Sequence, residues 1–297
     1  MVSLLRDTRL LLVTLCLGLS LPLCANAQTF SLDRQREQNE FGLRLDFGFI
    51  KKDGELTSDE ALLRTEVYGQ FVTGAFGGYM SLPLARSLSS EEEFDRTAIG
   101  NMEVGGYWMT VAGPVDFIFR FGLSLPTADA TLEGFSTNTY ASVSRLNDQL
   151  NVEPGILGAR LSVSPVIASD ILFFRLDLGF DFIFRLRDLY PGQIDISTRA
   201  QAAANDDFRL YLRANAGMGA DFGLASVAIE FVNVISIADE LMPYGVIAVE
   251  RSMHAITVGT WFNLDIVHPY VAVTVPLDGS TTRTQGFALS TGVEVRL

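Results

Sequence analysis

The feature of this sequence that most constrains its fold is an alternation of apolar and polar side chains that recurs from residue 41 to the C-terminus. Phe117, Phe119 and Phe121 are separated by single residues, and one of those residues is Arg120. Successive side chains of a β-strand point to opposite faces. The spacing therefore predicts strands that each have one apolar face and one polar face.

We predict about twelve antiparallel strands. They cover residues 41–50, 62–72, 76–84, 99–111, 115–125, 155–167, 171–186, 207–220, 223–237, 252–263, 266–277 and 285–297. The connections after every second strand are short, and the others are mostly long and polar. The long connections are 51–61, 85–98, 126–154, 187–206, 238–251 and 278–284. Tight turns that alternate with long loops are typical of an up-and-down transmembrane β-barrel.

The composition agrees with an all-β membrane protein. The chain has 21 Phe and only two Lys, and it contains no run of 18 consecutive apolar residues that would predict a transmembrane helix. A soluble β-sandwich would also give strands with two unlike faces, so the loop lengths rather than the alternation favour the barrel. The net charge of −13 argues against nucleic acid as a partner.

The N-terminus has the order of a secretory signal peptide. Arg6 and Arg9 precede an apolar run over residues 10–23, and the small residues Ala25 and Ala27 follow it. We therefore predict a cleaved signal peptide at 1–27, a periplasmic N-terminal segment at 28–40, and an outer-membrane barrel at 41–297. Such an assignment places the protein in a Gram-negative bacterium.

A lipoprotein signal that uses Cys24 is the alternative, but Leu23 stands where such a signal favours a small residue. Cys16 and Cys24 are the two cysteines of the chain, and both lie in the predicted signal peptide. We therefore expect no disulfide and no thiol chemistry in the mature protein.

Charged residues within the predicted strands share the polar parity, which is expected to face the barrel interior. The predicted lumen-lining residues are Arg44, Asp46, Arg64, Glu66, Glu103, Asp116, Arg120, Arg160, Arg175, Asp177, Asp181, Arg185, Arg209, Arg213, Glu230, Glu294 and Arg296. Two interpretations of this balanced set stay open. The side chains either neutralise one another and fill a narrow lumen, or they form the walls of a wet passage.

The longest predicted loop, 126–154, contains a candidate short helix between Tyr140 and Leu150. Folded inward, this loop would constrict a channel, whereas folded outward it would cover the surface. Other aromatic residues are candidates for anchors at the membrane interface. They are Trp108, Tyr140, Tyr190, Tyr244 and Trp261.

Residues for metal binding or catalysis are sparse. The chain has two histidines, His254 and His268, and neither has the spacing of a metal-binding cluster. Lipases are known on twelve-stranded barrels, and Ser252 with His254 is the candidate pair for such a reaction. Two residues without an orienting third group do not predict a hydrolase. We expect no enzyme activity, no catalytic residues, no metal and no cofactor.

Two stretches, residues 100–106 and 122–129, resemble a family of proteobacterial outer-membrane barrels associated with the meta-pathway of phenol degradation. That family carries a Gly-Asn/Asp-Leu-x-Leu-Gly stretch and a strand that ends in Leu-Pro-Thr-Gly-Asp. Here Ala128 replaces the Gly of the second motif, and the final residue is Leu297 where barrels commonly end in Phe. The resemblance implies a transporter-like barrel that takes up small molecules, hydrophobic ones among them.

The expected function is a porin-like channel for passive or facilitated diffusion of small solutes, including hydrophobic or aromatic ones. The alternative is a non-conducting structural or surface-interaction barrel with acidic extracellular loops. The expected partners are outer-membrane lipid and lipopolysaccharide, the outer-membrane assembly machinery, and a small solute. Both termini are expected in the periplasm, with the long loops outside the cell.

Overall fold

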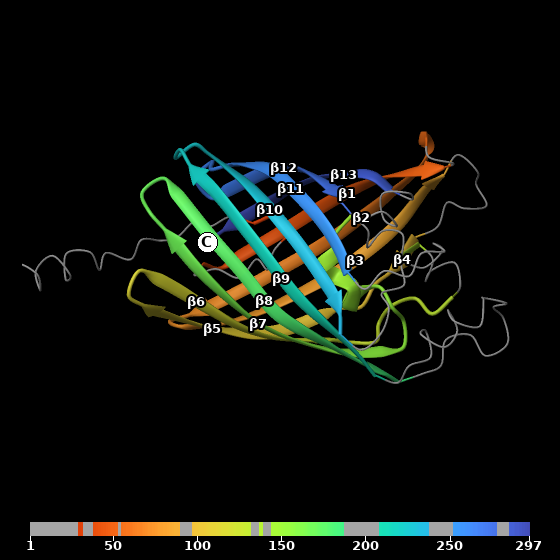
Figure 1. Ribbon diagram of the computed structural model, residues 1–297, viewed down its shortest axis with the longest axis horizontal. Coiled ribbons are helices and arrows are strands. Elements are labelled where there is room, and N and C mark those ends of the chain that lie inside the picture. The colour runs from red at the N-terminus through yellow and green to blue at the C-terminus, as the bar shows by residue number, and fades with distance from the viewer. Residues whose placement is uncertain are drawn as a thin grey trace, which may run out of the picture.

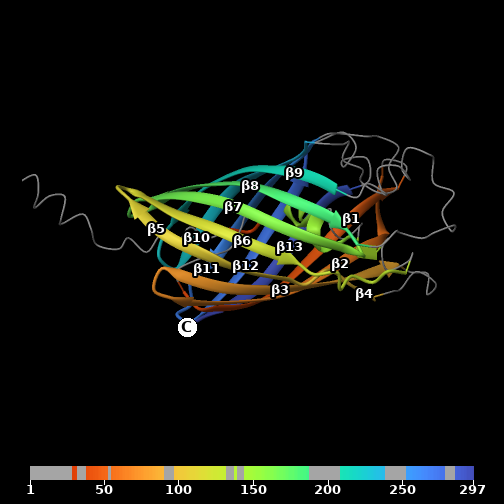
Figure 2. The same ribbon diagram turned by 90° about the horizontal axis from the view of Figure 1, so that it is seen from below.

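The described residues form one closed β-barrel. The computed structural model describes residues 29–31, 38–52, 55–89, 97–131, 137–138, 144–186, 208–237, 252–277 and 285–297. The predicted signal peptide lies outside the described residues. The tight turns and the C-terminus lie at one end of the barrel, which we call the turn end, and the opposite end is called the loop end (Figures 1 and 2).

Thirteen strands build the barrel wall within the described ranges. They are β1 (Glu40–Lys52), β2 (Glu55–Thr73), β3 (Phe76–Ser89), β4 (Thr97–Ile99), β5 (Glu103–Ala112), β6 (Val115–Ser124), β7 (Ile156–Ala168), β8 (Leu172–Arg185), β9 (Phe208–Asp221), β10 (Ala225–Ser236), β11 (Ser252–Phe262), β12 (Val267–Pro276) and β13 (Gln285–Arg296). All strand pairs are antiparallel, and each strand pairs with the strands before and after it in the sequence. The exception is the short β4, which pairs only with β3, so that β3 also pairs directly with β5.

The first and last strands close the barrel. In β1, Phe41 lies opposite Val295 and Phe49 lies opposite Phe287 of β13, while the other edge of β1 pairs with β2. The predicted closure between residues 41–50 and 285–297 is therefore confirmed. Closure satisfies the backbone N–H and C=O groups that an open sheet edge would leave without partners.

The twelve predicted strands are confirmed, with one interruption that the sequence did not predict. The strand expected at 99–111 is divided into β4 and β5 by Gly100, Asn101 and Met102. A Cβ atom at Gly100 would lie 2.5 Å from the Asn151 carbonyl oxygen and 2.8 Å from Pro83 Cγ. Only glycine fits there, because the chain of residue 151 presses against the wall at this point.

One predicted loop is wrong. Residues 51–61 were expected to form a long connection, but β1 and β2 continue past the expected boundary, and Lys52 pairs with Glu55. The predicted connection 85–98 is also partly strand, since β3 extends to Ser89. The alternation weakens at these ends, so the strands predicted from the sequence are too short.

The two faces of the wall differ as the alternation predicts. On the outer face, Phe119 is 40% exposed and Phe180 is 43% exposed, whereas the inner Asp177 and Arg213 are fully buried. A continuous apolar exterior around a charged interior is stable in hydrocarbon and not in water. No helix among the described residues is long and apolar enough to cross a bilayer.

Two segments that are not strands occupy the interior. One is η2 (Leu146–Asn151), a 3₁₀ helix that belongs to the long segment between β6 and β7. The other is Thr29–Phe30–Ser31, which precedes β1 and is buried. An apolar cluster surrounds each of them, with Leu146 and Leu150 in one and Phe30 in the other. The sequence left open whether the loop 126–154 folds inward or outward, and in the structure η2, which belongs to this loop, lies inside the barrel.

The outer face generates a prediction about depth in the membrane. Val258 lies midway along β11 and is 52% exposed, so Val258→Arg should destabilise the folded barrel by about 2–4 kcal/mol in lipid. Leu224 lies in the turn between β9 and β10, and Leu224→Arg should cost only about 0–1 kcal/mol. Reversible unfolding from lipid vesicles measures both values, and equal costs would contradict a membrane-facing exterior.

Candidate functional site in the barrel interior

The predicted lumen-lining residues lie on the inner face of the wall. All of them are buried except Asp116 and Arg185, which are half-buried. The structure thus brings their side chains together inside one closed wall. It also shows partners that the sequence did not identify, because those partners come from the two inserted segments.

A chain of ion pairs begins on the first two strands. The Arg44 guanidinium lies 2.6 Å from the Asp46 carboxylate, and Arg64 lies 3.4 Å from the other oxygen of Asp46. Arg64 and Glu66 are also paired, at 3.4 Å. Alternation places all four residues on the inner face, since they lie two apart on β1 and β2.

A second set of ion pairs covers the opposite part of the wall. Arg160 on β7 lies 3.0 Å from Asp181 and 3.2 Å from Glu103. Arg213 on β9 lies 3.2 Å from both Asp177 and Asp181. Each buried charge in this set therefore has an opposite charge beside it, which offsets the cost of removing it from water.

The inserted η2 connects the two sets. Asp148 lies 2.6 Å from Arg64 on β2 and 3.9 Å from Arg160 on β7. Arg145, just before η2, lies 2.8 Å from Glu66 and 3.3 Å from Asp148. The helix is therefore held in the barrel by charges that it shares with both sides of the wall.

The Asp148 carboxyl is the centre of this connection. Burial raises its pKa, but Arg145, Arg64 and Arg160 lower it more in total, so the pKa lies below its ordinary value. Asp148 is therefore ionised at neutral pH. Its charge holds η2 in place.

Backbone and amide groups add to the anchoring of η2. Arg160 donates to the Asn147 carbonyl oxygen at 2.6 Å, and the Asn215 side chain donates to Asn147 Oδ1 at 3.1 Å. Just after η2, the Glu153 carboxylate lies 2.6 Å from Arg185 and also contacts Arg209. The whole stretch from Arg145 to Glu153 is thus bonded to the wall.

The interruption between β4 and β5 forms the junction between the wall and the inserted loop. The Asn101 side chain donates to the carbonyl oxygens of Leu150 at 2.9 Å and Glu153 at 2.6 Å, and it accepts from Ala128 N at 2.9 Å. Thr127 Oγ1 donates to the Gly100 carbonyl oxygen at 2.9 Å. The two stretches that carry the family resemblance therefore meet at one place and fix the base of the loop.

The N-terminal segment fills the interior nearer the turn end. The N–H groups of Phe30 and Ser31 donate to the two carboxylate oxygens of Glu230 at 2.7 and 2.6 Å. The Phe30 ring stacks on Trp261 with a centroid distance of 5.2 Å. Asn147 donates to the Ser31 carbonyl oxygen at 2.7 Å, so the two inserted segments are in contact.

Aromatic rings on the inner wall lie over glycines. A Cβ atom at Gly77 would lie 2.1 Å from Tyr107 Cζ, and one at Gly105 would lie 2.5 Å from Tyr79 Cε1. These glycines leave room for the rings to lie flat against the backbone. The Tyr79 hydroxyl donates to Glu103 at 2.6 Å and accepts from Arg120 at 2.7 Å. These two hydrogen bonds connect the aromatic rings to the ion pairs.

Two predictions about individual residues have different outcomes. Trp261 was a candidate for an anchor at the membrane interface, and that candidate is wrong, because Trp261 is 1% exposed inside the barrel. Its parity on β11 is that of the inner face, so the alternation itself could have placed it correctly. Trp108 lies on the outer face and is 43% exposed. Tyr140, Tyr190 and Tyr244 lie outside the described residues.

The Ser252 and His254 side chains are in contact, at 3.1 Å between Ser252 Oγ and His254 Nε2. The His254 ring also stacks on Phe231 on the outer face, with a centroid distance of 5.9 Å. A hydrolytic site needs hydrogen-bond donors for an oxyanion as well as a nucleophile and a base. This pair alone does not build one. Among the described residues, no cluster of His, Cys, Asp or Glu could hold a metal ion.

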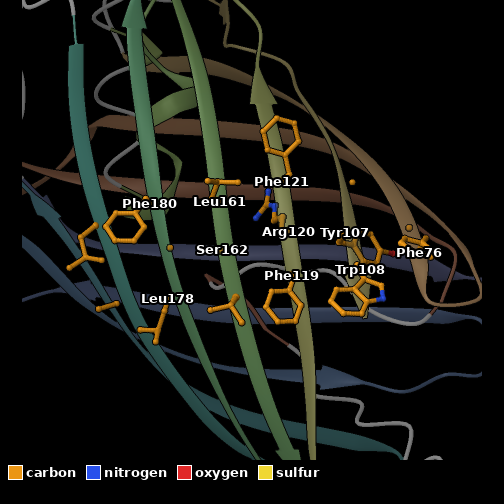
Figure 3. A pocket seen from close by; sticks show the side chains of 16 residues that line it. Phe76, Tyr107, Trp108, Phe119, Arg120, Phe121, Leu161, Ser162, Leu178 and Phe180 are labelled. Carbon is orange, nitrogen blue, oxygen red and sulfur yellow. The ribbon is translucent and has the colours of Figure 1, made fainter. Parts of the chain in front are cut away.

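The outer wall has an apolar recess of about 960 Å³ on β3 and β5–β9 (Figure 3). The Trp108 and Phe119 rings stack there at 5.3 Å, next to Phe121 and Phe180. The recess faces away from the ion pairs. In a membrane it would be covered by hydrocarbon.

Comparisons with known proteins support the fold. The COG4313 outer membrane channel from Pseudomonas putida F1 has a similar structure, with 10% sequence identity, a TM-score of 0.53, and coverage of 89% of this chain and 97% of that one. The NanC porin is similar with 10% identity, a TM-score of 0.52, and coverage of 86% and 100%. No protein-family model and no curated protein matches the sequence. At these identities the likeness shows that this chain has the fold of outer-membrane β-barrels.

The pairing of η2 with the wall can be tested by neutralising Asp148. Asp148→Asn leaves Arg64 and Arg145 with one carboxylate fewer, so the amide hydrogens of residues 144–151 should exchange at least about tenfold faster, because losing one member of a buried ion pair is strongly destabilising. Asp265→Asn is the matched control, because Asp265 lies in an exposed turn at a φ of 52°, which Asn tolerates. Unchanged exchange in Asp148→Asn would show that hydrogen bonds alone hold η2.

The lowered pKa of Asp148 predicts a pH dependence. A carboxyl whose pKa is lower in the folded state stabilises that state above its unfolded pKa of about 4, and this stabilisation is lost as the pH falls through the folded value. Hydrogen exchange of residues 144–151 should therefore accelerate at acidic pH beyond its intrinsic dependence. The acceleration should be smaller in Asp148→Asn, and an equal acceleration in both proteins would assign the effect to other carboxylates.

Proposed function

We propose that this protein is an outer-membrane channel for small solutes whose passage is closed, in the state described here, by η2 and the segment Thr29–Ser31. The observation that supports this proposal is that charged side chains bind η2 to the wall, with Asp148 between Arg64 and Arg160. Hydrophobic or aromatic solutes are part of the proposal, as the sequence resemblance implies.

The charged wall supports a channel over a purely structural barrel. Buried ion pairs can often be replaced by apolar side chains without loss of stability, so a barrel that only needs to be solid does not require them. If η2 left the interior, the wall exposed there would consist of residues such as Arg64, Glu66 and Arg160. Water would hydrate such a wall readily, and a polar passage would result.

The proposal includes the orientation in the membrane. The C-terminal residue Leu297 and Asn39, next to β1, are hydrogen-bonded at the turn end. In barrels of this type the tight turns face the periplasm and the long loops face outward. The same arrangement would place the apolar exterior against lipid and lipopolysaccharide. The acidic loops on which the surface-interaction alternative depends lie mostly outside the described residues.

Conductance through planar bilayers tests the proposal. Asn101→Ala removes three hydrogen bonds from the base of the inserted loop, so the open probability should rise on the order of tenfold relative to the native barrel. Asn263→Ala is the matched control, because Asn263 ties the turn end through the Gly223 carbonyl oxygen and Ser226 and makes none of these contacts with the loop.

A second variant, in which residues 144–151 are replaced by a flexible Gly-Ser linker, should conduct in most recordings. If native, Asn101→Ala and linker barrels are all folded and none conducts, the non-conducting alternative is correct. Heat-dependent mobility of the folded barrel on gels would establish folding independently of current.

A further inference from the structure

The recess that holds Phe30 has the construction of a binding site. It lies between β10, β11, β12 and β1, and it is lined by Glu230, Gly259, Trp261, Tyr270 and Arg44. The hydrogen bonds of Phe30 and Ser31 described above are made with side chains of the wall and of η2, and neither residue belongs to a strand. Phe30 therefore occupies the recess in the manner of a bound molecule.

The aromatic part of the recess fits a flat ring. Phe30 is 1% exposed, and its ring lies at 19° to Trp261 and 5.8 Å from the Tyr270 centroid. Gly259 forms the floor, since a Cβ atom there would lie 2.6 Å from Phe30 Cζ. Stacked and tilted aromatic contacts favour an aromatic ring over an aliphatic group of similar size.

The polar part of the recess selects what is attached to the ring. Both Glu230 oxygens accept N–H groups, at 2.7 Å from Phe30 and 2.6 Å from Ser31. On the other side, Arg44 donates to the Phe30 carbonyl oxygen. A ligand that satisfies all three contacts has an aromatic ring, neighbouring N–H donors and a carbonyl acceptor. Hydrogen bonds to charged groups are stronger than neutral ones, so these contacts also discriminate between ligands.

We propose that this recess is a binding site for aromatic amides and aromatic amino-acid or peptide derivatives, and that Phe30 occupies it as a tethered competitor. The inference deepens the channel proposal and rests on it for the route by which a ligand arrives. Phe30 lies on the turn-end side of the ion pairs and contacts η2 through Ser31 and Asn147. A ligand in the recess would therefore displace a segment that closes the passage.

The fluorescence of Trp261 provides the test. The chain has two tryptophans, so Trp108→Phe leaves Trp261 as the reporter. In that background, a barrel that lacks Thr29–Ser31 should bind L-phenylalaninamide saturably and about tenfold or more tightly than the intact barrel, because the tethered competitor is gone. Toluene, which offers the ring alone, should bind the truncated barrel about tenfold more weakly than phenylalaninamide.

Glu230→Gln in the truncated barrel should weaken phenylalaninamide binding about tenfold and leave toluene binding unchanged. Glu103→Gln is the matched control. Glu103 is also a buried carboxylate on the inner face, but it pairs with Arg120 and Arg160, whereas Glu230 accepts the N–H of Phe30. Equal binding of toluene and phenylalaninamide, or no effect of Glu230→Gln, would mean that the truncation only creates a cavity without selectivity. Either result would overturn the proposal.

The intact barrel provides a measurement that does not depend on the truncated variant folding. Saturating phenylalaninamide should accelerate hydrogen exchange at the amides of Phe30 and Ser31, which Glu230 protects, and toluene should do so less. No acceleration would overturn the tethered-competitor inference. Binding without any current in bilayers would leave the site in place and contradict only the channel proposal.

Discussion

Charged side chains enclosed by a barrel wall need partners of opposite charge inside the barrel. In this protein the ion pairs run from one side of the wall to the other through η2. The ion pairs of β1 and β2 and those of β5 to β9 are separate on the wall, and Asp148 on η2 contacts both. The charge distribution of the wall and the position of the inserted loop therefore depend on each other. Removing η2 would leave a wall that only water could solvate.

The interior is layered along the barrel axis. Near the turn end, aromatic rings that include Phe30, Tyr107 and Tyr270 pack over glycines. The ion pairs follow, and a second apolar cluster around Leu150 and Ile156 lies against η2. Both inserted segments use this layering, since each has an apolar side chain in one cluster and hydrogen bonds to a polar layer. Such a filled interior is consistent with a barrel of intermediate size, in which side chains and short inserts can reach across the lumen.

The wall itself is modified where the insert begins. At Gly100 and Asn101 the strand is interrupted, and Asn101 turns from strand pairing to hydrogen bonds with Leu150 and Glu153. Thr127 and Ala128, where the loop leaves β6, bond to the same place. Residues 100–101 and 127–128 thus have a structural task in this protein, which is to fix the base of the inserted loop. Strand interruptions of this kind commonly redirect side chains next to functional sites.

Alternation of side chains in the sequence determined the strands and the parity of residues such as Asp177 and Arg213, because side-chain direction in a strand is fixed by local geometry. The alternation of short and long connections is what favoured a closed barrel over a sandwich. It also carried the information that Trp261 faces inward. It could not place Asp148 between Arg64 and Arg160, nor Phe30 between Glu230 and Trp261, because those contacts join segments far apart in the chain and follow no local period. Whether the interior was open or filled was therefore decided by the tertiary structure alone.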